Sequence, residues 1–179
     1  MKKNKRTALT FAALAIPVMA TAICICMCIW TIVSAFPVQA AGDSIVVIVN
    51  GSNPVDNLSM GELRKLFLSD RTRWDTGRDV APVMLTAGAP ERTLFLKIVF
   101  GMNDADFDRY FLRVSFTGKS VTPPKVVGSV RDVRRIVGNS PGAIGFVRSS
   151  DFHDASNSVI KMVKIDGFAA TDAAYKIHM

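Results

Sequence analysis

The sequence has few of the residues that metal and redox sites require. It contains three cysteines and two histidines among its 179 residues. The cysteines, Cys24, Cys26 and Cys28, all lie inside an apolar run near the N-terminus, so the rest of the chain has no thiol for a disulfide or a zinc site. His153 and His178 are not spaced as metal ligands with other candidates. We therefore expect neither a metal nor a cofactor.

The sequence also has no complete catalytic motif. Residues 138–142, GNSPG, match the G-x-S-x-G pattern of a nucleophile elbow, which requires a strand before the serine and a helix after it. The predicted order here is the reverse, and Pro141 lacks the N–H that would help to form an oxyanion hole. Residues 118–120, GKS, resemble the end of a phosphate-binding P-loop, but Arg113 occupies the position of its first glycine. Neither motif predicts catalysis.

An acidic segment resembles a calcium-binding loop only in part. Asp104, Asp106 and Asp108 alternate as calcium ligands do, but Arg109 follows where that loop has a glycine. An apolar helical stripe continues through the segment, so we interpret these aspartates as acids at the start of a helix. With no metal loop and no credible nucleophile, we expect no catalytic residue and a chain that is not an enzyme.

The net charge is too small to predict nucleic-acid binding. The formal charge of +7 includes four basic residues, Lys2, Lys3, Lys5 and Arg6, in a segment without acids. Residues 41–179 therefore carry 18 basic and 15 acidic side chains, a balance of +3. Such a mild excess does not indicate a nucleic-acid partner.

The N-terminal segment 1–40 is predicted to direct export. Its basic start is followed by the uncharged run 7–42, and residues 38–40, VQA, offer a small-residue cleavage site. The run exceeds both the roughly 7 to 15 apolar residues of most signal peptides and the roughly 20 that span a bilayer. The segment is therefore a cleaved signal peptide or a retained membrane anchor. Either would place the domain 41–179 in the periplasm or elsewhere outside the cytoplasm. If the N-terminal segment is not cleaved, the membrane is contacted only through it.

The domain 41–179 alternates between apolar strands and amphipathic helices. We predict strands at 44–50, 82–85, 143–147 and 159–165, and helices at 59–69, 90–101, from 103 or 104 through 114, and 129–138. This alternation predicts an α/β protein, a layered sheet with helices on its faces. Residues 118–124 are expected to form a loop, and the tail after Gly167 is left unassigned.

Several single residues support these elements. Ser59 and Glu62 form a predicted capping box at the start of the first helix. Gly101 and Gly138 are expected to end helices. Trp74 lies in a polar turn and is predicted to pack over the first helix rather than to contact a ligand.

A basic stripe lies on the last predicted helix. Arg131, Arg134 and Arg135 occupy the face opposite its apolar residues. We interpret the stripe as a solvated surface, with contact to an anionic membrane or partner as the alternative.

Residues 81–101, APVMLTAGAPERTLFLKIVFG, predict a strand, a short loop and a helix in direct succession. Pro90 and Glu91 suit the first turn of the helix, and the loop 86–89 consists of small residues. A loop that leads from a strand into a helix N-terminus leaves backbone N–H groups unpaired, and these can bind an anion. The loop is therefore a candidate ligand site. The alternative is a crossover without a ligand.

An ordered set of residues resembles a known family. The set comprises Asn53-Pro54-Val55, Leu58-Ser59, Glu62-Leu63-Arg64 with Phe67, Trp74, Gly77 and the segment 141–146, PGAIGF. In order and spacing, over roughly Ile45 to Asp166, it resembles the substrate-binding protein of bacterial phosphate ABC transporters. The resemblance implies one lobe of the type II periplasmic-binding-protein fold, because the chain has length for little more than one of that family's two lobes.

The resemblance also implies a site. The family's phosphate loop carries an arginine followed by Ser-Gly-Thr at a helix N-terminus, and this place corresponds to the segment Thr86 through Thr93. Thr86 stands where the arginine would be, and residues 90–92, PER, replace Ser-Gly-Thr. The residues implied to bind an anion are Thr86, Ala87, Gly88, Ala89, Arg92 and Thr93.

Two functions follow from the resemblance. The first is an exported solute-binding protein that holds a small anion such as phosphate for a membrane transporter or sensor. The second is an exported interaction or scaffold domain that keeps the fold without a ligand. Pro90 and Glu91 suggest the second function, since they remove a donor from the loop and add a negative charge to it. Two single lobes could also pair to rebuild a cleft.

Overall fold

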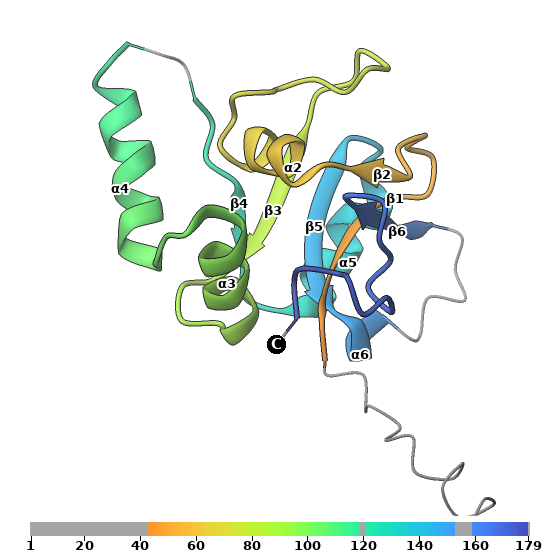
Figure 1. The fold of residues 1–179 in the computed structure, drawn as a ribbon. Coiled ribbons are helices and arrows are strands. Elements are labelled where there is room, and N and C mark those ends of the chain that lie inside the picture. Colours follow the sequence, from red (N-terminus) through yellow and green to blue (C-terminus); the bar gives the residue numbers. More distant parts are fainter. Residues whose placement is uncertain (1–42, 119–120, 153–158, 179) are drawn as a thin grey trace, which may run out of the picture. The chain divides into compact units, whose positions relative to one another are not determined.

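The computed structural model describes residues 43–118, 121–152 and 159–178. These residues form a six-stranded sheet in the order β2-β6-β1-β5-β3-β4, with helices packed against it (Figure 1). The strands are β1 (Ile45–Asn50), β2 (Asn57–Leu58), β3 (Ala81–Leu85), β4 (Lys125–Val127), β5 (Ala143–Arg148) and β6 (Ile160–Ile165). The helices are α2 (Met60–Phe67), α3 (Pro90–Phe95), the π-helical segment η1 (Leu96–Phe100), α4 (Asp104–Ser115), α5 (Val130–Asn139) and α6 (Ser149–Phe152). The predicted α/β sheet with helices on its faces is confirmed.

Some sequence predictions fall outside the described residues. They are the signal peptide or anchor at 1–40, the positions Lys119 and Ser120, and His153. Within residues 43–118, 121–152 and 159–178, no helix combines the length and the apolar character needed to cross a membrane. The same ranges contain no group of three or more potential metal ligands.

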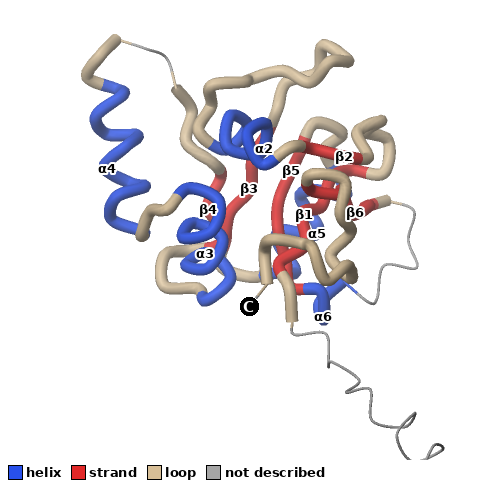
Figure 2. Tube along the Cα trace, in the orientation of Figure 1, coloured by secondary structure: helices blue, strands red, loops and turns tan. Residues whose placement is uncertain are grey.

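Figure 2 shows the strands in red, and the sheet that they form is mixed because it contains both antiparallel and parallel pairs. β1 pairs antiparallel with β5 and with β6, whereas β3 pairs parallel with β4 and with β5. The short β2 adds a parallel pair beside β6. The carboxyl ends of the parallel strands β3 and β4 therefore lie next to each other, so the loops that follow them can share a site.

β1 supplies both faces of the hydrophobic core. Ile45, Val47 and Val49 join a cluster that includes residues of α2 and α3. Val46 and Ile48 join a second cluster, together with residues of α5. All five side chains are at most 1% exposed. The nearly continuous β-branched run predicted a strand covered on both faces, and the structure confirms it.

The predicted helix ends are mostly confirmed. The Ser59 hydroxyl accepts a hydrogen bond from the Glu62 amide, and the Glu62 carboxylate accepts one from the Ser59 amide at 2.8 Å. The amide and the hydroxyl of Ser59 both donate to the Glu62 carboxylate, and these two bonds hold the pKa of Glu62 below its usual value. Asn103 and Ser129 cap α4 and α5 with their side chains. Gly101 adopts a left-handed conformation, with φ of 68°, after η1.

The prediction that Gly138 ends the last helix was wrong. α5 continues to Asn139, with Ser140 as its C-cap. The side-chain amide of Asn50 donates to the carbonyl oxygens of Val137 and Gly138, at 2.9 and 2.7 Å. A side chain from β1 thus satisfies carbonyls that a glycine cap would otherwise satisfy, so the glycine can stay helical.

Four short elements were not predicted: β2, β4, α6 and the π-helical segment η1. β2 has two residues and β4 has three, which is too few to show a hydrophobic period. The π-helical segment η1 continues α3 within the single helix predicted at 90–101. Its apolar residues have the same helical pattern as α3, so the sequence does not distinguish the two hydrogen-bond patterns.

The C-terminal tail, unassigned from sequence, closes the start of β1. The Tyr175 hydroxyl donates to the Ile45 carbonyl at 2.7 Å, and the Ile45 amide donates to the Ile177 carbonyl at 2.9 Å. Tyr175 and Ile177 are 2% and 0% exposed. Burial raises the pKa of Tyr175 far above its usual value, so the hydroxyl remains a donor over the whole working range of pH.

The PGAIGF segment serves packing. The Trp74 indole donates to the Gly142 carbonyl at 2.9 Å and is 3% exposed, which confirms its predicted packing role. A Cβ on Gly142 would lie 2.0 Å from the Asp79 carbonyl oxygen, and one on Gly145 would lie 2.8 Å from Cγ1 of Val133. Close approach of neighbouring elements therefore requires glycine at both positions.

We expect Gly142→Ala to destabilise the fold by about 2 kcal/mol or more, because its methyl group would meet a backbone oxygen that no rotamer change can move. Gly61→Ala is the matched control. Gly61 lies in α2, where an added Cβ has its nearest contact at 3.9 Å, so alanine should stabilise by about 0.5 to 1 kcal/mol. Urea unfolding of the two variants measures both effects. A cost below about 0.5 kcal/mol at Gly142 would contradict the packing role.

Candidate functional site

The candidate loop connects β3 to α3 at the edge of the sheet. Thr86, Ala87 and Gly88 are exposed, as is Thr93 on the first turns of α3. Gly88 has a φ of 83°, a left-handed conformation that side chains other than glycine rarely adopt. The Thr86 amide donates to the Val127 carbonyl at 3.0 Å, which ties the loop to the end of β4. The predicted loop therefore exists and faces solvent.

Most of the loop amides have partners inside the chain. The Ala89 amide donates to the Thr86 carbonyl at 3.2 Å, and the Thr93 amide donates to the Ala89 carbonyl at 3.0 Å. The Gly88 amide points to Oδ2 of Asp104 at 3.4 Å. Among the described residues, Ala87 is the one position of the loop 86–89 whose amide has no such partner. Pro90 has no amide N–H to offer.

Arg92 is the candidate residue that the structure places away from solvent. Its side chain is 3% exposed. Nε donates to Oδ1 of Asp104 at 2.5 Å, Nη2 to Oδ1 of Asp108 at 3.1 Å, and Nη1 to the Leu85 carbonyl at 3.1 Å. The guanidinium also lies 5.8 Å from the centre of the Phe107 ring. Arg92 thus joins β3, α3 and α4, and two carboxylates offset its charge.

Glu91 carries a second buried charge beside the loop. It is 8% exposed, and its carboxylate accepts a hydrogen bond from Nε of Arg148 at the end of β5. A buried carboxylate requires such a partner, because desolvation of an unpaired charge costs several kcal/mol. The negative charge that the sequence places in this segment is therefore compensated within the fold.

The structure brings the six candidate residues together only in part. Thr86, Ala87, Gly88 and Ala89 form one loop, with Thr93 exposed on the adjoining helix, whereas the Arg92 side chain turns toward α4. Their role in anion binding stays a prediction. Sequence reasoning missed Asp104 as a member of this group. From the sequence, Asp104 was predicted to be an acid at the start of a helix. Nothing in the local pattern shows that α4 brings Asp104 next to Gly88.

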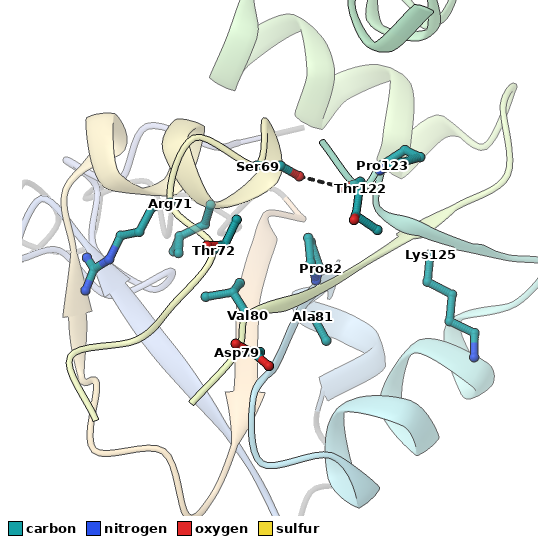
Figure 3. Close-up of a pocket in the computed structure, with 11 residues that line it drawn as sticks. Ser69, Arg71, Thr72, Asp79, Val80, Ala81, Pro82, Thr122, Pro123 and Lys125 are labelled. Carbon is teal, nitrogen blue, oxygen red and sulfur yellow. Dashed lines mark hydrogen bonds between the residues drawn. The ribbon is translucent and has the colours of Figure 1, made fainter. Parts of the chain in front are cut away.

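Two hollows lie away from the exposed face of the loop. One, of about 340 Å³, lies at the start of β3 and is drawn in Figure 3. Its Arg71 and Lys125 side chains extend outward in different directions, and Arg71 is ion-paired with Glu62 and Asp75. The other, of about 230 Å³, lies between α4 and β4 and is lined in part by Arg92.

No protein-family model matches the sequence. Among solved structures, the chain is similar to a putative phosphate ABC transporter substrate-binding protein with bound phosphate from Clostridium perfringens. The TM-score is 0.60 at 19% identity, covering 76% of this chain and 53% of that one. The fold is that of a periplasmic-binding-protein lobe. The chain is also similar to an ABC-type phosphate transport receptor from Vibrio cholerae. The TM-score is 0.56 at 20% identity, covering 73% of this chain and 49% of that one.

A third structure with this periplasmic-binding-protein fold is a possible phosphate binding protein from Planctomyces limnophilus. Its TM-score is 0.54 at 18% identity, with coverage of 79% of this chain and 46% of that one. This chain therefore spans about half the length of the solved proteins that it matches. At such identities the likeness shows the fold alone.

We expect Arg148→Met to destabilise the fold by about 2 kcal/mol, because it leaves the Glu91 carboxylate buried without its partner. Arg148 is 32% exposed, so water that reaches Glu91 in the variant should keep the loss at this lower value. The double variant Glu91→Gln with Arg148→Met should recover much of the loss. Urea unfolding of the wild type, both single variants and the double variant measures the coupling. Additive effects would show that the pair does not act as one unit.

Proposed function

We propose that the chain is an exported solute-binding protein that holds a small anion such as phosphate at the loop 86–89. The observation that carries the proposal is the exposed loop at the end of β3, in a fold shared with a protein whose solved structure contains bound phosphate. Binding needs no catalytic group. The proposed role is to present the anion to a membrane transporter or sensor.

The proposed donors are groups that face solvent. They are the Ala87 amide and the hydroxyls of Thr86 and Thr93, with the Gly88 amide shared with Asp104. Neutral donors of this kind can bind an oxoanion without a compensating positive charge. A single loop surrounds only one side of a phosphate. The other side is proposed to come from the transporter, the sensor or a second copy of the chain, since this chain spans about half the length of the solved relatives.

Export is part of the same proposal. Segment 1–40 directs the chain across the membrane as a cleaved signal or holds it there as an anchor, and residues 41–179 act outside the cytoplasm. If the segment is retained, it alone contacts the membrane. Neither nucleic acid nor a cofactor takes part.

Thermal unfolding of the full chain tests anion binding. Phosphate at 100 times its dissociation constant should stabilise the folded state by about 2.7 kcal/mol, relative to chloride at equal ionic strength. The combined variant Thr86→Val and Thr93→Val should lose most of this shift. Thr76→Val, in the exposed turn before β3, should retain it. The proposal is wrong if phosphate, sulfate and small carboxylates all leave the wild-type midpoint unchanged.

The second candidate function is an exported interaction or scaffold domain without a ligand. It is favoured by the Arg92 contacts, in which one positive charge meets the two negative charges of Asp104 and Asp108. The local balance is therefore one net negative charge, which opposes a free anion. In this function the exposed loop contacts a protein.

Photo-crosslinking in intact cells tests the second function. A photoreactive side chain at Ala87, on the loop, is compared with one at the exposed Thr76. The scaffold function predicts a defined adduct from Ala87 alone, together with no thermal response to phosphate. Equal adducts from both positions, or none from either, would remove the support for a partner at the loop.

A further inference from the structure

The carboxylate of Asp104 lies between the Arg92 guanidinium and the Gly88 amide. We propose that the Arg92 guanidinium and the Gly88 amide form an anion site whose resident ligand is this carboxylate of the chain itself. Asp104 then competes with any external anion at the loop. The inference rests on the proposed function, because it concerns the same loop and states what limits anion binding there.

The two oxygens of Asp104 divide between two donors from different segments. Oδ1 accepts from Nε of Arg92 at 2.5 Å, and Oδ2 lies 3.4 Å from the Gly88 amide. A carboxylate or phosphate that bridges a guanidinium and a loop amide uses its oxygens in the same way. Asp104 is a member of α4, twelve or more residues along the chain from both donors. Tertiary packing therefore brings this ligand to the site.

Burial of Arg92 makes the site dependent on an anion. The guanidinium is 3% exposed, and a buried charge is stable only when it is paired. The other contacts of Arg92 occupy Nη1 and Nη2, through the Leu85 carbonyl and Asp108. Without Asp104, Nε would have no acceptor among these partners. A small external anion could then supply one.

The position of Asp104 allows access from solvent. Its side chain is 25% exposed, and Gly88 at the other end of the contact also faces solvent. Truncation to glycine removes a carboxymethyl group and leaves space comparable to formate or acetate. Arg92 itself lines the hollow of about 230 Å³, together with Asp108 of α4. An anion can therefore reach the guanidinium without unfolding of the loop.

A structural ion pair and an internal ligand predict different responses. Either one would make Asp104→Gly less stable. Only an anion site would recover stability on addition of a small carboxylate, because a pair that merely holds α4 in place requires the covalent link to the helix.

The test uses the full chain and its thermal midpoint in sodium formate, with sodium chloride at the same ionic strength as reference. Asp104→Gly should lower the midpoint, and formate should restore about half of the loss. Asp106→Gly is the matched control, because Asp106 lies on the same turn of α4 but pairs with the exposed Arg109. Neither this control nor the wild type should respond to formate beyond the chloride reference.

Asp104→Asn provides a second measurement that does not depend on recovery from a truncation. It keeps the side-chain shape and removes the negative charge, so phosphate should bind about tenfold more tightly than to the wild type. Dose dependence of the thermal midpoint measures this ratio. If Asp104→Gly fails to fold, this comparison alone decides the proposal.

The outcomes separate this inference from the proposed function. A wild type without a phosphate response, together with formate recovery of Asp104→Gly, supports the internal ligand and overturns anion binding as the native function. A wild type that binds phosphate, together with an Asp104→Asn variant that binds no more tightly, overturns the internal ligand and leaves the native function in place. Absence of both formate recovery and tighter binding also overturns the inference.

Discussion

The fold depends on one strand that must be covered on both sides. β1 lies between β5 and β6, and its residues from Ile45 to Val49 are at most 1% exposed. Alternate side chains of a strand point to opposite faces, so a strand that is apolar throughout requires a packed layer on each side. Here α5 covers one face, and α2 with α3 covers the other. Hydrogen bonds also fasten the two ends of β1, from Asn50 to the end of α5 and from the C-terminal tail to Ile45.

This arrangement explains why the residues that resemble a family are mostly internal. Trp74 donates to the carbonyl of Gly142, and Gly142 approaches the backbone at Asp79 so closely that no side chain fits. Gly145 allows α5 to approach β5 in the same way. Such residues are required where the layers pack closely, so a sequence resemblance that rests on them indicates a shared fold. They carry no information about a ligand.

The loop itself combines a favourable position with unfavourable charges. It lies where the parallel strands β3 and β4 end, a place at which open α/β sheets bind ligands. Its neighbouring charges are nevertheless engaged within the chain. Arg92 contacts Asp104 and Asp108, and Glu91 contacts Arg148. Each buried charge is thus paired across two elements, which stabilises the contact between α3 and its neighbours but leaves little free positive charge for an anion.

The sequence by itself determined the elements whose signals are local. The β-branched run of β1, the capping box of Ser59 with Glu62, and the left-handed Gly101 all depend on residues close together in the chain, so pattern and propensity predict them. The same holds for the position of the loop 86–89. β2 and β4 are too short to show a hydrophobic period in the sequence. The tail with Tyr175 has no clear sequence pattern, and its role became visible only from its contacts with β1.

Only the tertiary structure decided which distant residues the polar groups of a helix or loop contact. Gly138 remains helical because Asn50, far away in the sequence, satisfies the last carbonyls of α5. Arg92 was expected among the anion-binding residues, yet its side chain turns toward Asp104 on α4. The physical reason is the same in each case. The periodicity and the caps of a helix or strand are visible in its own sequence. The partner of a buried polar group is a distant side chain, and the packing of the layers decides which side chain comes within hydrogen-bond distance.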